Sequence, residues 1–171
     1  MVTGQRVIEH TAWAIREHAA RLKDRPDAEP IHVLIVDDEA SVLRYVERVL
    51  GDAGYATVSA LSGEEAIRIA AERGPFDLLV TDLKMPRMRG DELARRLTYN
   101  DPQLRVLYLT GYSDALFKEK VALWEGEAYL DKPATVNGLL EAVSMVLFDH
   151  LLPARPESSA WARLRSLLTL H

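Results

Sequence analysis

Between residues 31 and 148 the sequence alternates regularly between short apolar runs and longer segments with apolar residues at helical spacing. The run 32–36 shows no alternation of polar and apolar residues, which is typical of a strand covered on both faces. We predict strands over 32–36, 55–59, 76–81, 104–109 and 128–130, and helices over 40–52, 63–73, 90–98, 113–123 and 135–148. Strands that alternate with helices favour an α/β domain with a parallel sheet.

The connections between these segments limit the topology further. Right-handed crossovers leave few arrangements, and the natural one is the flavodoxin-like order 2-1-3-4-5 of a doubly wound, five-stranded sheet. Local signals agree with this pattern. Ser62 is followed three residues later by Glu65, which predicts a capping box at the start of the second helix.

Both ends of the chain extend beyond the predicted domain, which covers residues 31–149. Residues 1–30 read as an amphipathic helix followed by a linker with two prolines. Residues 150–171 read as an extension with a short helical piece, and they are too few for a DNA-binding output domain of ~60 residues. The apolar positions of the two extensions are Ile8, Ala12, Ile15, Ala19 and Leu22, and Trp161, Leu164, Leu167 and Leu168. Each extension would pack on the domain, or one of them would form a homodimer or dock a kinase.

Composition excludes several classes of function. The net charge is −5 and the acidic excess falls in the middle of the chain, which argues against a DNA-binding surface. No apolar stretch approaches the ~20 residues that span a membrane. The N-terminus lacks the apolar run of a signal peptide, so we expect a cytoplasmic protein. The absence of cysteine excludes disulfides and thiolate metal sites.

Polar residues follow the predicted strands at the points where the strands end. Asp37 and Asp38 follow the first strand, Asp82 the third, Thr110 the fourth and Lys132 the fifth. In open α/β sheets, ligands bind beyond the carboxyl ends of the strands, where the strand order reverses. We therefore expect three carboxylates, a hydroxyl and an ammonium group to converge there.

These groups have complementary chemistry. Carboxylates that crowd together raise one another's pKa unless a cation neutralises them, and Mg²⁺ prefers such oxygen ligands. One carboxylate can then act as a nucleophile toward phosphorus. Each residue alone has an ordinary explanation, such as a solvated loop, a helix cap or a turn. The occurrence of all of them in this order is far more specific.

Four segments resemble the motifs of response-regulator receiver domains of two-component signalling, the CheY-like family. They are Val33-Leu34-Ile35-Val36-Asp37-Asp38-Glu39, Asp82-Leu83-Lys84-Met85-Pro86-Arg87-Met88-Arg89-Gly90, Leu109-Thr110-Gly111-Tyr112 and Tyr129-Leu130-Asp131-Lys132-Pro133. The resemblance covers about residues 31–149. It implies a signalling domain that catalyses only its own phosphorylation and dephosphorylation.

The resemblance also implies a role for each matching residue. Asp82 would be the phosphoacceptor. Asp38, Asp82 and the carbonyl of Lys84 would bind Mg²⁺ directly, whereas Asp37 would act mostly through water. The loop after the acceptor would be shaped by Met85-Pro86 and Gly90.

Two further positions in the resemblance concern phosphoryl binding and output. Lys132 would pair with the phosphoryl group and Thr110 would hydrogen-bond to it. Thr110 and Tyr129 would then act as the switch that alters the surface of residues 113–148. The implied partners are a sensor histidine kinase or phosphotransfer protein and a downstream protein target.

Some positions depart from the family pattern, and some alternatives stay open. Lys84 and Tyr112 occupy positions that tune the lifetime of the acyl phosphate, and Ala134 stands where many members have Phe. A phosphatase with an aspartyl-phosphate intermediate would need a general acid at position 84, where this chain has Lys. An interaction module that keeps only the fold would not need the acidic residues. The sequence fits either a free-standing receiver, which we favour, or the receiver of a hybrid kinase.

Overall fold

The computed structural model describes residues 30–111 and 127–148, and they form one parallel sheet with helices on both faces. The five strands are β1 (His32–Val36), β2 (Ala56–Ala60), β3 (Leu78–Thr81), β4 (Arg105–Thr110) and β5 (Glu127–Asp131). The helices described are α2 (Ala40–Asp52), α3 (Gly63–Arg73), α4 (Gly90–Asn100) and α6 (Val136–Phe148). The strand order is β2-β1-β3-β4-β5, which confirms the predicted flavodoxin-like topology.

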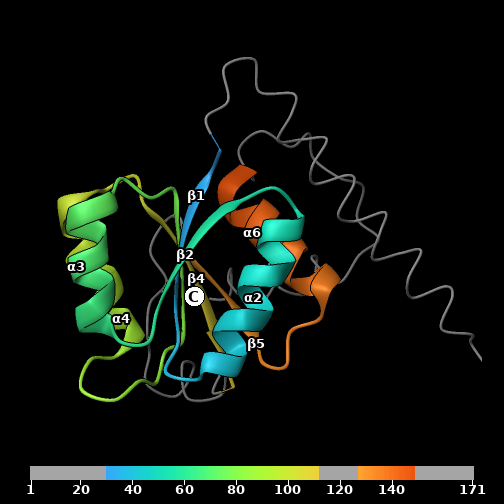
Figure 1. Ribbon diagram of the computed structural model, residues 1–171, viewed down its shortest axis with the longest axis horizontal. Helices are drawn as coiled ribbons and strands as arrows, with labels where there is room; N and C mark the ends of the chain where they lie inside the picture. Colours follow the sequence, from blue (N-terminus) through green and yellow to red (C-terminus); the bar gives the residue numbers. More distant parts are fainter. Residues whose placement is uncertain (1–29, 112–126, 149–171) are drawn as a thin grey trace, which may run out of the picture.

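The helices divide into two layers (Figure 1). α3 and α4 cover one face of the sheet, and α2 and α6 cover the other. Alternate residues of β1 show how one strand serves both layers. Val33 and Ile35 pack in the core under α2 and α6, while Leu34 and Val36 pack in the core under α3 and α4. All four are at most 1% exposed, as expected for a central parallel strand.

The beginning of α3 follows the predicted capping pattern. The Ser62 side chain accepts a hydrogen bond from the backbone N–H of Glu65, at 3.2 Å. The Glu65 carboxylate in turn accepts one from the N–H of Leu61, at 2.9 Å. These bonds satisfy two donors near the start of the helix, so they fix where the helix begins.

Several boundaries match the predictions and others differ by one or two residues. β1, α2 and α3 have the predicted bounds, whereas α4 continues to Asn100. β2 begins at Ala56 because the N–H of Tyr55 bonds to Leu50 at the end of α2. Phe76 is buried but precedes β3, which begins at Leu78.

Other predictions fall on residues outside the described ranges. They are the N-terminal helix and linker, the helix over 113–123 and the C-terminal extension. Among the described helices, none is long and apolar enough to cross a membrane.

Candidate functional site

The parallel register places two acidic residues side by side beyond the sheet. Val36 of β1 pairs with Thr81 of β3, so the residues that follow them, Asp37 and Asp82, are neighbours. The N–H of Asp82 donates to the carbonyl of Val36 at 2.9 Å, which extends the ladder by one step. The N–H of Asp37 bonds to Ala60 at the end of β2 in the same way, at 3.2 Å.

The three predicted carboxylates form a compact cluster. Each of Asp37, Asp38 and Asp82 offers an oxygen, and these oxygens all lie within 4.8 Å of one another. Asp37 and Asp82 are buried, at 2% and 7% exposure, whereas Asp38 is exposed. The cluster therefore has a rigid, buried side and a side that is open to solvent.

Lys132 follows β5, the edge strand of the sheet, and brings a positive charge to the same cluster. Its Nζ lies 2.6 Å from Oδ2 of Asp37 and 3.8 Å from Oδ1 of Asp82. Glu39 lies 3.9 Å away and is largely exposed. Ninety-five positions separate Lys132 from Asp37 in the sequence, and the end of β5 carries Lys132 to the common edge of the sheet.

Asp82 lies in an environment that disfavours its charge. Burial raises the pKa of the Asp82 carboxyl above its ordinary value; nearby Lys132 lowers it, and the negative charge of Asp37 raises it again. Oδ1 of Asp82 accepts a hydrogen bond from the N–H of Leu83 at 2.9 Å. This bond orients the carboxylate through its Oδ1 atom.

The loop after Asp82 runs very close to its backbone. The N–H of Gly90 donates to the carbonyl of Leu83 at 2.9 Å, which closes the loop. A Cβ atom at position 90 would overlap with the carbonyl oxygen of Asp82. Met85 and Met88 are buried in the core under α3 and α4. The loop thus depends on a glycine at its end and on two buried methionines.

The remaining predicted residues are placed less completely. Thr110 ends β4, between the strands that lead to Asp82 and Lys132, and its backbone pairs with Asp131 of β5. Its side chain lies outside the described part of the structure. Tyr129 is half-buried and packs against the core under α3 and α4. Burial raises the pKa of its hydroxyl, and the charge of Asp131 raises it further.

Lys84 is exposed in the loop after Asp82. The use of the Lys84 backbone carbonyl as a metal ligand stays a prediction. The roles of Thr110 and Tyr129 stay predictions too.

Two contributors to the site were not predicted from the sequence. The N–H of Glu39 donates to Oδ1 of Asp37 at 2.9 Å and holds that carboxylate in place. Tyr45 of α2 donates from its hydroxyl to the carbonyl of Ala134, at 2.9 Å, in the loop that follows Lys132. The position of Glu39 directly after the acidic pair was a usable signal for the first contact. No local pattern pointed to the second.

The donor set fits a hard divalent cation. Three carboxylates from two strand ends supply oxygen ligands, and the exposed side leaves room for water. Mg²⁺ usually keeps several waters and takes only a few protein ligands. Lys132 alone cannot neutralise three carboxylates, so a further cation would lower the repulsion among them.

Comparison with known proteins agrees with this geometry. The family model described as "Response regulator receiver domain" matches residues 33–144. The response regulator receiver protein CpdR of Brucella abortus (strain 2308) is 31% identical over 115 residues, which cover 67% of this chain and 95% of CpdR. The sensor kinase CckA of the same organism is 33% identical over 116 residues, which cover 67% of this chain but only 12% of CckA.

A solved structure gives the same result. The response regulator receiver protein from Sinorhizobium medicae WSM419 superimposes with a TM-score of 0.62 and 30% sequence identity, over 70% of this chain and 95% of that protein. The sheet order, the acidic cluster and these matches lead to one conclusion: the chain belongs to the response-regulator receiver domain family of two-component signalling.

Proposed function

We propose that this chain is a phosphoacceptor receiver in which Asp82 takes a phosphoryl group from a partner histidine kinase or phosphotransfer protein. The family is one of signalling domains, and its members bind Mg²⁺ in an acidic pocket. The observation that carries the proposal is the placement of Lys132 Nζ 3.8 Å from Oδ1 of Asp82, within a cluster of three carboxylates. This arrangement has a nucleophile, a cation for the transferred group and ligands for a metal.

The chemical step is a displacement at phosphorus. A carboxylate oxygen of Asp82 forms the new P–O bond, the P–N bond to the donor histidine breaks, and the imidazole leaves with the electron pair and takes up a proton. The hydrogen bond from Leu83 holds Oδ1, which favours attack through Oδ2. Asp82 must be ionised to attack, although its burial disfavours the charge.

Charge neutralisation is the main task of the other groups. Asp37, Asp38 and Asp82 would hold Mg²⁺, with the Lys84 carbonyl, and the metal would supply positive charge to the phosphoryl oxygens. Lys132 would turn from Asp37 toward the phosphoryl group. Thr110, at the end of the strand between them, would donate a hydrogen bond to the same group.

The output of the reaction would be a change of surface. Thr110 and Tyr129 lie on neighbouring strands, and the backbone of Tyr129 pairs with that of Tyr108 two residues before Thr110. Movement of Thr110 toward the phosphoryl group would allow Tyr129 to repack. The surface of residues 113–148 would then favour a different state and a different protein partner.

A small-molecule phosphodonor tests the proposal without the cognate kinase. The chain is incubated with acetyl phosphate and Mg²⁺, and its intact mass is measured over time. We expect the addition of one phosphoryl group, its absence without Mg²⁺, and its loss in Asp82→Asn. Asp52→Asn, which removes an exposed carboxylate at the far end of α2, is the matched control and should react as the native chain does.

Three other results would contradict the proposal. Phosphorylation that persists in Asp82→Asn would place the acceptor elsewhere. Rapid turnover of external phosphoesters would indicate a phosphatase, although position 84, where such an enzyme needs a general acid, is an exposed Lys. A chain that never gains mass would be an interaction module only.

A further inference from the structure

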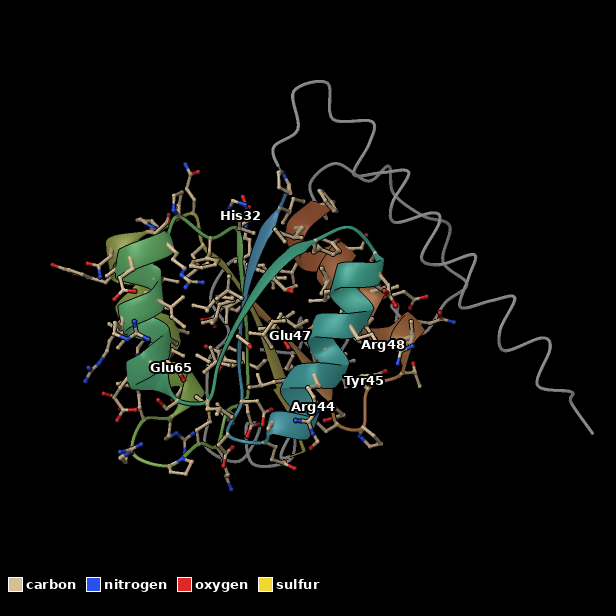
Figure 2. All side chains as sticks on the ribbon, viewed as in Figure 1. His32, Arg44, Tyr45, Glu47, Arg48 and Glu65 are labelled. Atoms are coloured by element: carbon tan, nitrogen blue, oxygen red, sulfur yellow. The ribbon has the colours of Figure 1, made fainter. Side chains whose placement is uncertain are left out.

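Tyr45 connects the first helix of the domain to the loop that carries Lys132. It lies in α2, is 37% exposed, and donates a hydrogen bond from its hydroxyl to the carbonyl of Ala134 at 2.9 Å. In Figure 2 its label lies on the side of α2 nearest the connection between β5 and α6. The two residues are 89 positions apart in the sequence.

The connection is also fastened at the α6 end. Thr135 Oγ1 accepts a hydrogen bond from the N–H of Gly138 at 3.1 Å, and the Thr135 carbonyl accepts one from Leu139 at 2.9 Å. Ala134 packs against the core under α2 and α6. The connection is short, because β5 ends at Asp131 and α6 begins at Val136. The Tyr45 bond lies two residues from Lys132.

The same helix begins directly after the acidic residues. The N–H of Glu39, which precedes α2, bonds to Oδ1 of Asp37, while Oδ2 of Asp37 bonds to Lys132 at 2.6 Å. The contacts thus form a closed ring that runs from Asp37 through α2 and Tyr45 to Ala134, and back through Lys132. A change in the Tyr45 bond would therefore shift the Lys132 ammonium group relative to Asp37.

We propose that Tyr45 is a positioning residue that sets where Lys132 stands relative to Asp82. The inference rests on the proposed phosphotransfer function. Lys132 has three carboxylates within 3.9 Å, so small movements of its loop decide which of them it favours. Phosphoryl transfer depends on placement of charge to within about 1 Å, because misplacement lowers the rate steeply.

The test is Tyr45→Phe, which removes the hydroxyl and keeps the ring. The rate of Asp82 phosphorylation is measured with acetyl phosphate and Mg²⁺, so that no kinase surface contributes. We expect the rate to fall about threefold to tenfold, the effect of one neutral hydrogen bond. Tyr99→Phe is the matched control, because Tyr99 is 88% exposed on α4, and its rate should be unchanged.

Three further measurements separate positioning from a general loss of structure. The affinity for Mg²⁺ should not fall in Tyr45→Phe, because the ends of β1 and β3 and the N–H groups of Glu39 and Leu83 position the carboxylates. In a Lys132→Ala background the same substitution should have no effect on the rate, since the residue it positions is gone. Backbone amides over 134–139 should exchange faster with solvent in Tyr45→Phe than in Tyr99→Phe.

The outcomes that overturn the inference differ from those that overturn the function. A native chain that is never phosphorylated contradicts the proposed function and this inference with it. A native chain that reacts, with Tyr45→Phe equally fast, overturns only the inference. A slowdown that persists in the Lys132→Ala background, or that follows a parallel loss of Mg²⁺ affinity, does the same.

Discussion

The carboxyl group of Asp82 is subject to two opposing influences. Burial at 7% exposure and the charge of Asp37 raise its pKa, while Lys132 lowers it. The ionised form of Asp82, which the proposed reaction needs, therefore costs free energy in the folded chain when no metal is bound. This cost lowers the stability of the metal-free fold, so unfolding experiments can measure it.

We predict that Asp82→Asn makes the metal-free protein more stable. Asparagine keeps the shape and the hydrogen bond from Leu83 but removes one of three crowded negative charges. We expect the free energy of unfolding to rise by about 1 kcal/mol, a typical size for a single substitution. Denaturant unfolding in EDTA at pH 7.5 measures it, and Asp52→Asn is the control that should not gain stability.

The stability gain of Asp82→Asn over the native chain should become smaller as the pH falls. Because the pKa of Asp82 is higher in the folded than in the unfolded chain, the ionised carboxyl destabilises the fold at neutral pH. As the pH falls through the folded pKa toward the ordinary value, protonation of the folded state removes the penalty. The stability difference between native chain and Asp82→Asn should therefore shrink on acidification, and a difference that grows would contradict this reading.

We predict that Gly90→Ala destabilises the protein through the loop after Asp82. The added methyl group would overlap with the carbonyl oxygen of Asp82, which the backbone must move to avoid. Overpacking of this kind costs about 1–3 kcal/mol. Gly51→Ala is the matched control, since nothing lies within 4 Å of its added Cβ in α2, and it should gain about 0.5–1 kcal/mol. Thermal unfolding of both variants gives the comparison.

At the scale of single elements, much of the structure could be predicted from the sequence. Residues 32–36 are apolar throughout because both faces of β1 are covered, and the capping pattern at Ser62 placed the start of α3. The errors occurred where a backbone bond decides the boundary. Tyr55 bonds to Leu50 and so closes α2 instead of beginning β2. Such a choice depends on the neighbouring strand, which no local pattern encodes.

The same distinction applies to the site. Strand ends and the reversal of strand order brought Asp37, Asp82 and Lys132 together in the prediction. The structure places an oxygen of Asp37 and one of Asp82 within 4 Å of Lys132 Nζ. The contact between Tyr45 and Ala134 depends on how α2 is rotated against a loop 89 residues away. That rotation follows from packing against the sheet, so it could not be read from spacing alone.

We predict that Ser62→Ala weakens α3. The Ser62 hydroxyl satisfies the N–H of Glu65 at the first turn, and its loss leaves that donor to water. The free energy of unfolding should fall by about 1 kcal/mol. Ser41→Ala, at an exposed position within α2, removes a hydroxyl of the same kind and should change stability little; equal losses in both variants would contradict the capping role.

At the scale of the whole molecule, the site is a product of the sheet. Its charged groups come from the ends of β1, β3 and β5, which have no contact in the unfolded chain. A ligand that binds this cluster therefore binds only the folded state and must stabilise the whole domain. Lys132 and a metal ion would share one task, because both would neutralise Asp37 and Asp82.

This shared task predicts that Lys132→Ala lowers the stability of the metal-free chain but raises its affinity for Mg²⁺. Without Mg²⁺ the variant leaves Asp37, which is 2% exposed, without its 2.6 Å partner, and unfolding should become easier by about 3 kcal/mol. With Mg²⁺ the cluster has no competing ammonium group, so the variant should bind the ion more tightly and recover part of the loss. Thermal unfolding across a Mg²⁺ titration gives both quantities, with Arg48→Ala, an exposed cation on α2, as the control. A larger rise in melting temperature for Lys132→Ala than for the native chain is expected, and an equal or smaller rise would mean that lysine and metal act on different groups.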